Sequence, residues 1–414
     1  MRVIGVQAIP IHEPEPIDDG GWWVTTPMDI LTTPERGHSG PAAPERGSRV
    51  TNVIVQVRTD TDIDGYGLVG VGSPSSVGVI EHHLAPVVIG QNPFDVERLW
   101  ELMYRSTLNI GRKGLVIEAI SAVDIALWDI MGKATSQPVY NLLGGRTNKR
   151  LRAYVSQSYA YADIDRVRAE AAQYMRDGFT ALKMRFGYGP SDGRAGMRKN
   201  YELVSAVREV VGDDVDLMAD AYMGWDVPYA IAMIRRLDDL ELRWVEEPVH
   251  PDNLDGYARI RMAVKTPISG GEHEFTRYGY RDMVDKRAVD ILQPDVNRMG
   301  GITEARKVWA LAQAHDLEVI PHSPQAHNAH LITAHLNSPM IEYFPHGALR
   351  YAYTFYDELF TGEPTAADGY LALSDRPGLG IEPNWDTIER YRADRPTPDD
   401  DTSTASLSPD HAGT

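Results

Sequence analysis

The chain has 414 residues, 43% of them hydrophobic, and carries 41 Lys and Arg against 59 Asp and Glu, for a net charge of −18. This acidic balance argues against nucleic acid or an anionic membrane as a partner, and no run of about 18 apolar residues predicts a membrane span. Cysteine is absent, which excludes disulfides, thiolate metal sites and cysteine nucleophiles. Pro10 and acidic residues come too early for a signal peptide, so a cytoplasmic location is expected.

The N-terminal part predicts a small α+β unit. Residues 2–11 and 49–60 alternate apolar with other residues, as strands of an antiparallel sheet do. Between them, residues 14–47 are rich in Gly, Pro, Asp and Thr, and so long a loop is usually a functional lid or disordered. Residues 92–106 and 114–136 show helical spacing.

From about Arg150 the pattern changes to short apolar strands that alternate with amphipathic helices. Such alternation predicts a parallel sheet covered by helices, and eight strands over roughly 200 residues suit a closed barrel. The expected strands are 151–158, 181–186, 215–222, 242–249, 267–273, 289–296, 317–323 and 339–344. The expected helices between them include 201–212, 227–237 and 302–315.

Three acidic residues recur where predicted strands end. Asp220, Glu246 and Glu272 follow one another at intervals of 26 residues, about the length of one βα unit in a barrel of roughly 250 residues. The carboxyl ends of barrel strands meet at one rim, where active sites lie. Three converging carboxylates repel one another unless a cation binds, and oxygen ligands suit Mg²⁺. We therefore expect a metal site; the alternative is three unrelated acids at helix N-caps or in salt bridges.

Two further strand ends continue this spacing. Asp295 lies 23 residues after Glu272, and His322 follows 27 residues later. An aspartate that accepts a hydrogen bond from an imidazole raises its basicity, so the pair is a candidate general base, although a lone histidine is more often structural. Lys183 and Arg185, at i and i+2 on the second strand, face the barrel mouth together. They would bind a carboxylate substrate or form salt bridges with acids across the barrel.

These features resemble those of the enolase superfamily, and in particular its mandelate racemase branch. The resemblance rests on the strand-end acids, the Lys-x-Arg and Asp–His pairs, and the stretch AISAVDIALWDIMGKATSQPVYNLLGG. It implies an α/β fold, a modified TIM barrel of the (β/α)7β type with an N-terminal α+β capping domain. The implied divisions are a capping domain with substrate lid loops (1–135), the catalytic barrel (136–345), a C-terminal segment completing the cap (346–395) and a disordered tail (396–414).

The resemblance also implies chemistry. The family abstracts the proton α to a carboxylate and uses Mg²⁺ to stabilise the enediolate. Carried over by position, the three strand-end acids are the metal ligands, and Asp295 with His322 forms the base. Glu342, at the end of MIEYF, corresponds to the carboxyl group that hydrogen-bonds the substrate carboxylate in the racemases.

One position departs from the racemase pattern. Racemases of this branch carry Lys-x-Lys on the second strand, and the second lysine is a base; here Arg185 takes its place, and arginine is a poor base. This favours removal of one proton by His322, followed by loss of the β-hydroxyl as water. The implied activity is a hydro-lyase that converts an acid sugar to a 2-keto-3-deoxy acid. GGEHEFT, QPDVNRMGGIT, VIPHS and TTPMDI are most similar to rhamnonate-dehydratase-like proteins.

Other functions remain open at this point. A racemase, epimerase or cycloisomerase of the same fold would exchange the C2 proton without losing water. A non-catalytic homologue that kept the metal site would need no base pair, and a metal-dependent aldolase would lack the capping domain. Only 8 of the 41 basic residues are lysine, which fits either a high-salt habitat or compositional bias.

Specificity is expected to come from the lid and from the loop at 187–200. Candidate substrate contacts are Trp23, Arg36 and His38 in the lid, with Trp22 beside them, and His273 after the third acid. Protonation of the leaving hydroxyl falls to the His322 conjugate acid or to His273. The substrate is a small acid sugar of undetermined identity, and the family resemblance implies a homo-oligomer.

Overall fold

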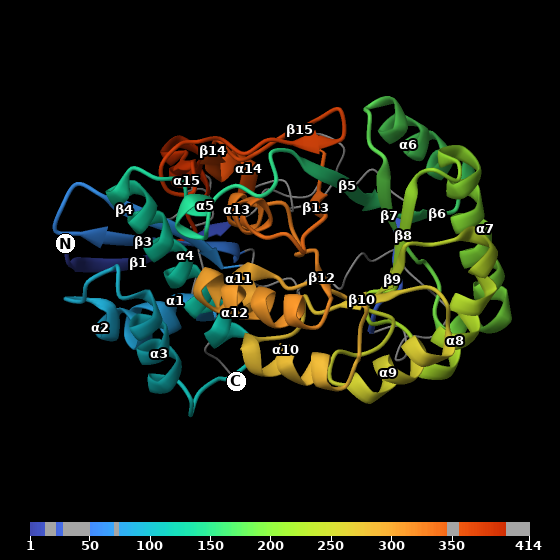
Figure 1. Cartoon of the computed structure of the whole chain (residues 1–414), viewed down its shortest axis with the longest axis horizontal. Helices are drawn as coiled ribbons and strands as arrows, with labels where there is room; N and C mark the ends of the chain where they lie inside the picture. Colours follow the sequence, from blue (N-terminus) through green and yellow to red (C-terminus); the bar gives the residue numbers. More distant parts are fainter. Residues whose placement is uncertain (13–21, 28–49, 70–73, 346–355, 395–414) are drawn as a thin grey trace, which may run out of the picture.

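The computed structural model describes residues 1–12, 22–27, 50–69, 74–345 and 356–394. Its N-terminal part is an antiparallel sheet of order β1-β3-β4 that packs against helices (Figure 1). The strands are β1 (Val3–His12), β3 (Val50–Thr59) and β4 (Asp64–Val69). The helices are α1 (Pro74–Gly78), a π-helical turn (Val79–Leu84), α2 (Ala85–Val88), α3 (Val96–Ser106), α4 (Leu115–Thr135) and α5 (Val139–Leu142).

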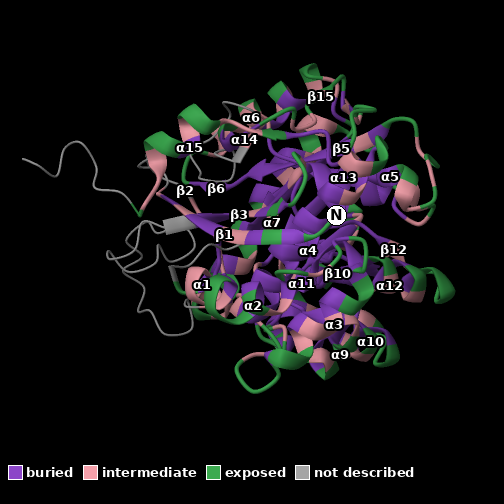
Figure 2. Cartoon of the chain, turned by 90° about the vertical axis from the view of Figure 1, so that its left-hand side faces the viewer, coloured by how far each residue is buried: buried purple, intermediate pink, exposed green. Residues whose placement is uncertain are grey.

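The long helix α4 is the centre of this domain. Most of its residues are apolar, and nearly all of them, the polar ones included, are buried; Figure 2 shows α4 within the buried interior. Its close approach to β4 depends on two glycines. A Cβ atom at Gly65 or Gly67 would lie 2.0 Å from the carbonyl oxygen of Ala126 or Ala122, so a larger residue at either position would push the helix off the sheet.

Eight parallel strands form the second part of the molecule, and helices surround them (Figure 1). Seven strands are each followed by a helix and the eighth is not, so the predicted (β/α)7β fold is confirmed. The strands are β5 (Leu151–Ser158), β7 (Ala181–Arg185), β8 (Asp216–Asp220), β9 (Trp244–Glu246), β10 (Ile268–Gly270), β11 (Ile291–Leu292), β12 (Glu318–Val319) and β13 (Met340–Tyr343). The helices are α6 (Ile164–Arg176), α7 (Gly193–Val211), α8 (Val227–Arg236), α9 (Leu254–Ala263), α10 (Thr276–Asp285), α11 (Val296–Met299), α12 (Gly301–Ala314) and α13 (Ala326–Ala334), with short 3₁₀ turns at Pro190–Asp192 and Asp238–Leu240.

The strands pair in chain order from β5 to β12, and β13 returns to pair with β5, where Glu342 lies opposite Tyr154. The last and first parts of the barrel are therefore adjacent. Next to β12, the Val319 amide donates to the Asn337 carbonyl at 2.8 Å, just before β13 begins. Several regular strands are shorter than expected: β9 has three residues, and β11 and β12 have two each.

The described C-terminal segment returns to the N-terminal domain (Figure 1). The Leu379 amide donates to Asp129 Oδ1 at 2.9 Å, and the Ala393 amide donates to the Pro10 carbonyl at 2.8 Å. Its elements are α14 (Tyr356–Leu359), β14 (Phe360–Thr361), β15 (Ala366–Ala367), β16 (Tyr370–Leu371), β17 (Glu382–Pro383) and α15 (Trp385–Tyr391). Within the described ranges, no helix is both long and apolar enough to cross a membrane.

Candidate active site at the barrel rim

A layer of apolar side chains fills the barrel interior and fixes where the polar groups stand. It consists of Tyr154, Ala181, Met218, Trp244, Ile291, Ile320 and Met340, contributed by seven different strands. Side chains on a strand alternate between its two faces, so the residue two positions later faces the same interior. Those residues are Ser156, Lys183, Asp220, Glu246, Gln293, His322 and Glu342. The candidate site is therefore the next layer of the barrel, directly above an apolar floor.

Lys183 and Arg185 form ion pairs with acids on other strands of the barrel. Lys183 Nζ contacts Glu246 Oε1 and lies 3.0 Å from Glu342 Oε1, and all three side chains are buried. Arg185 Nη1 lies 2.5 Å from Asp220 Oδ2. Salt bridges with barrel acids are thus present as expected, but Arg185 pairs with an acid on the adjacent strand β8 and not across the barrel. These pairs hold both cations in place, because removal of one partner of a buried ion pair strongly destabilises the folded protein.

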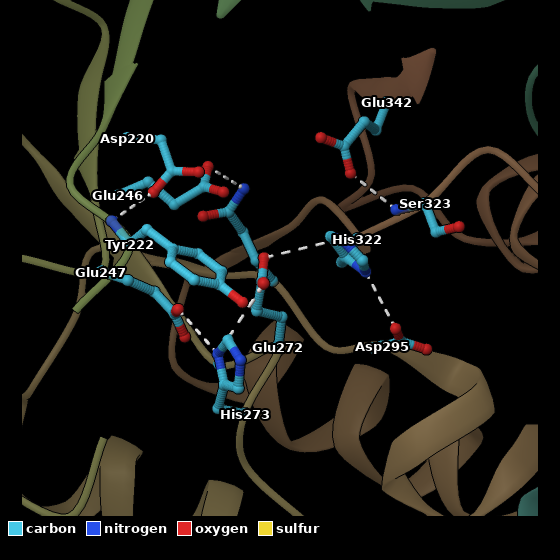
Figure 3. A network of polar contacts seen from close by, with 12 residues as sticks. Asp220, Tyr222, Glu246, Glu247, Glu272, His273, Asp295, His322, Ser323 and Glu342 are labelled. Carbon is cyan, nitrogen blue, oxygen red and sulfur yellow. Dashed lines mark hydrogen bonds and ion pairs between the residues drawn. The ribbon is translucent and has the colours of Figure 1, made fainter. Parts of the chain in front are cut away.

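The three acids predicted as metal ligands converge at the rim (Figure 3). Burial raises the pKa of Glu246 to about 7, and burial also raises the pKa of Asp220 despite the nearby Arg185. Burial acts on Glu272 in the same direction, but the positive charges of His322 and His273 outweigh it and lower its pKa to about 2. Glu272 accepts no hydrogen bond from any residue in the described part of the chain, so its oxygens are available to a ligand.

The charges in this layer fit a bound divalent cation. Six carboxylates are buried there: Asp220, Glu246, Glu247, Glu272, Asp295 and Glu342. The two permanent cations, Lys183 and Arg185, pair with three of them. The surplus of carboxylate oxygens suits a hard cation such as Mg²⁺, which takes oxygen ligands.

Glu247 is a site residue that the sequence interpretation did not assign. Its Oε2 lies 2.8 Å from His273 Nδ1, and its Oε1 is buried without a hydrogen-bond partner among the described residues. Ligand atoms of Glu247, Glu272 and His273 lie within 4.8 Å of one another. The available sequence signal was the second acid of the EEP motif, although regular strand alternation would place it on the face opposite to Glu246. Its φ of 37° turns it back toward the rim.

His322 and Asp295 form the predicted pair (Figure 3). His322 Nδ1 lies 2.8 Å from Asp295 Oδ2, and the other ring nitrogen, Nε2, lies 3.9 Å from Glu272 Oε2. Burial by itself would lower the pKa of His322, but the charge of Glu272 and the hydrogen bond with Asp295 raise it to about 10. Asp295 orients the ring, and Nε2 faces the acids of the site.

Two more predicted residues join this layer. Glu342 Oε2 accepts a hydrogen bond from the Ser323 amide at 2.6 Å, beside the histidine. Burial acts to raise the pKa of Glu342, but Lys183 and His322 outweigh it and lower that pKa. His273 packs its ring edge-on against Tyr222, with centroids 5.8 Å apart. Glu342 and His273 therefore lie at opposite sides of His322 and Glu272, as Figure 3 shows.

Two further residues that sequence reasoning missed fix Glu246. Trp244 Nε1 donates to Glu246 Oε2 at 3.0 Å, and Gln293 Nε2 donates to the same oxygen at 2.8 Å. Both lie on the interior face. Trp244 stands two residues before Glu246, and Gln293 lies one strand beyond Glu272. The period of the strands was the available signal, since it brings i and i+2 together.

The predicted lid contacts are only partly described. β2 (Trp22–Trp23) pairs antiparallel with β6 (Ala160–Tyr161), next to the first barrel strand. Trp23 packs edge-on against Tyr188 in the loop after β7, with centroids 5.7 Å apart, so this part of the lid is anchored at the correct rim. Arg36, His38 and most of the segment 14–47 lie outside the described residues.

Comparison with known proteins places the chain in a family. Residues 31–144 match the mandelate racemase / muconate lactonizing enzyme N-terminal domain, and residues 166–387 match the enolase C-terminal domain-like family. The L-rhamnonate dehydratase of Saccharopolyspora erythraea is 37% identical over 335 residues, or 80% of this chain and 83% of that protein.

Solved structures give the same result. Rhamnonate dehydratase from Gibberella zeae complexed with Mg has a TM-score of 0.82 at 33% identity, covering 94% of this chain and 96% of that one. The 3,6-anhydro-D-galactonate cycloisomerase from Zobellia galactanivorans has a TM-score of 0.78 at 30% identity, covering 95% and 99%. The chain therefore belongs to the mandelate racemase / muconate lactonizing enzyme family of the enolase superfamily.

Proposed function

We propose that the protein is a Mg²⁺-dependent dehydratase of acid sugars, which removes the C2 proton and the C3 hydroxyl to give a 2-keto-3-deoxy sugar acid. The enzyme class is that of the hydro-lyases, to which the L-rhamnonate dehydratase relatives belong. The observation that carries the proposal is that the site has one candidate base where a racemase has two. His322 is held by Asp295, whereas Arg185, at the position of a second base, is paired with Asp220.

The metal would be held by Asp220, Glu246 and Glu272, and Glu247 and His273 lie next to Glu272. Bound there, Mg²⁺ supplies positive charge against the negative charge that develops on the substrate carboxylate. Lys183 balances the charge of Glu246 from the barrel side.

The chain's own residues account for the proton transfers. The charge of Glu272, which raises the pKa of His322, would be balanced by Mg²⁺, so that the neutral imidazole takes the C2 proton through Nε2. The electrons of the C2–H bond first move onto the substrate carboxylate, and they then form the C2=C3 double bond as the C3–O bond breaks. The leaving oxygen receives a proton from the His322 conjugate acid or from His273 and departs as water. The enol product then tautomerises to the 2-keto-3-deoxy acid. Glu342, Arg185 and the lid residue Trp23, with Arg36 and His38, are the proposed substrate contacts.

The test is a screen of the purified protein with Mg²⁺ against mono- and diacid sugars, with semicarbazide absorbance to detect 2-keto-3-deoxy product. Turnover of one or a few aldonates, abolished by EDTA and restored by Mg²⁺, is the expected result. No product from any sugar acid, together with C2 deuterium exchange in D₂O, would contradict dehydration and favour isomerisation. That alternative has a specific basis, since the cycloisomerase shares this fold.

A further inference from the structure

Helix α4 of the N-terminal domain makes a continuous polar seam with the segment that follows Asp295. The seam residues Glu118, Ser121, Asp124 and Trp128 are spaced by three or four positions, so they line one face of the helix. All four are buried. Figure 1 shows α4 next to α11 and α12, the two helices on the other side of the seam.

Each seam residue has a partner between residues 298 and 303. Ser121 Oγ accepts from the Gly300 amide at 2.8 Å, and Asp124 Oδ2 accepts from the Thr303 amide at 2.9 Å. Trp128 Nε1 donates to the Thr303 hydroxyl at 2.9 Å. Arg298 Nε donates to Glu118 Oε1 at 3.2 Å.

The same segment begins with Asp295, the acid of the Asp295–His322 pair. Asp295 caps α11: its Oδ1 accepts from the Asn297 amide at 2.8 Å, and its carbonyl accepts from the Arg298 amide at 3.0 Å. The other carboxylate oxygen, Oδ2, contacts His322. Because one oxygen is committed to α11 and the other to the imidazole, a rotation of α11 would change the geometry of the His322 hydrogen bond.

Arg298, the partner of Glu118, carries a positive charge near the Asp295–His322 pair. Its side chain is 13% exposed, and that of Glu118 is 7% exposed. Burial would lower the pKa of Arg298, but Asp295 and Glu118 raise it. The guanidinium is therefore hydrogen-bonded to an acid of the N-terminal domain, and it also feels the charge of the acid that orients His322.

We propose that Glu118 positions the Asp295–His322 pair by holding Arg298 away from Asp295, which makes α4 part of the support of the general base. This inference rests on the proposed function. Without Glu118, the buried guanidinium is left with the charges of Asp295 and Glu272, and Arg298 would compete with His322 for Asp295. The base would lose its orientation while the substrate contacts remain in place.

The experiment compares Glu118→Gln with Glu101→Gln in the full-length protein with Mg²⁺. Glu101 is a matched control, because it also joins α3 of the N-terminal domain to a barrel arginine, Arg277 in α10, at 2.8 Å. For Glu118→Gln we expect kcat to fall about tenfold, the low end of the effect of removing an outer partner of a metal site, with KM unchanged within about twofold. For Glu101→Gln we expect neither constant to change. Arg298→Lys, which keeps the charge, is expected to retain most of the activity.

Equal kcat for the two glutamine variants would overturn the proposal, as would a rise in KM matching the fall in kcat. Amide hydrogen exchange of the peptide 295–303 is the second readout, and it needs no turnover. Faster exchange is expected in Glu118→Gln but not in Glu101→Gln; equal exchange would also overturn the proposal. If the wild-type protein dehydrates no acid sugar, the proposed function fails by itself, and the exchange measurement still decides the positioning role.

Discussion

Trp244 and Glu246 stand on the same face of β9, and the indole Nε1 of Trp244 donates to Glu246 Oε2 at 3.0 Å. The tryptophan belongs to the apolar floor of the barrel and the glutamate to the polar layer above it. A core side chain therefore orients a proposed metal ligand directly. The packing of the barrel interior thus also sets the geometry of the site.

This contact predicts that Trp244→Phe weakens Mg²⁺ binding. The ring still fills the floor, but one donor to Glu246 is lost, and partners of metal ligands typically change affinity by about 10–100-fold. Isothermal titration with Mg²⁺ measures the effect. Trp309→Phe is the control, since Trp309 is equally buried and donates to Ser338 on the outside of the barrel. Equal Mg²⁺ affinity in both variants would contradict the assignment of Glu246.

The dyad predicts that His322→Asn abolishes turnover while the fold and Mg²⁺ binding are retained. Removal of a general base costs about 10²–10⁴-fold in rate. The measurements are kcat, the circular dichroism spectrum and Mg²⁺ titration of the same preparation. Dehydration that persists in His322→Asn would make the base assignment wrong, and Lys183 would become the candidate.

The ion pairs of Lys183 predict that Mg²⁺ binding is linked to the stability of the folded protein. Lys183→Met leaves Glu246 and Glu342 buried without their common cation, and the loss of one partner of a buried pair costs about 3–5 kcal/mol. We expect a large fall in the urea midpoint of the metal-free protein. Saturating Mg²⁺ should restore part of it, because a ligand that binds only the folded state stabilises that state. A variant as stable as wild type without metal would contradict this account of the pair.

His330 predicts a loss of stability in mild acid. It is fully buried, with Nδ1 accepting from the Tyr140 amide at 3.1 Å and Nε2 facing the Leu379 carbonyl at 3.1 Å. Burial lowers its pKa from 6.5 to about 4. The unfolded chain binds the proton first, so stability is complete above pH 6.5 and falls as the pH drops toward 4, by about 3 kcal/mol at the low end.

Urea unfolding at pH 7.5, 6 and 5 measures this dependence, with His330→Gln for comparison. Buried His327, whose pKa burial also lowers to about 4, contributes in the same direction in both proteins. The difference between the two slopes therefore belongs to His330. Identical slopes in wild type and His330→Gln would show that His330 is not the titrating group.

The fold and most of the candidate site could be predicted from local sequence patterns. The spacing of Asp220, Glu246 and Glu272 by one βα unit follows from the repeat length of a barrel, and their common rim follows from parallel strands. Strand alternation predicted that Lys183 faces inward. The pairing of Asp295 with His322 followed from consecutive strand ends. All these inferences use periods that the chain itself carries.

Other features of the site depend on contacts between distant segments, which no repeat spacing in the sequence predicts. The turn that brings Glu247 back to His273 results from a positive φ at a strand end, where the next strand and its loop set the backbone path. The contact of Lys183 with Glu342 exists because β13 returns to pair with β5. Glu118 and Arg298 are 180 positions apart and meet only through the packing of α4 on the barrel. The sequence by itself determined which residues face the barrel interior, because strand geometry is local; the tertiary structure decided which of them meet, because ion pairs and hydrogen bonds between distant segments form only when the barrel and its capping domain are packed together.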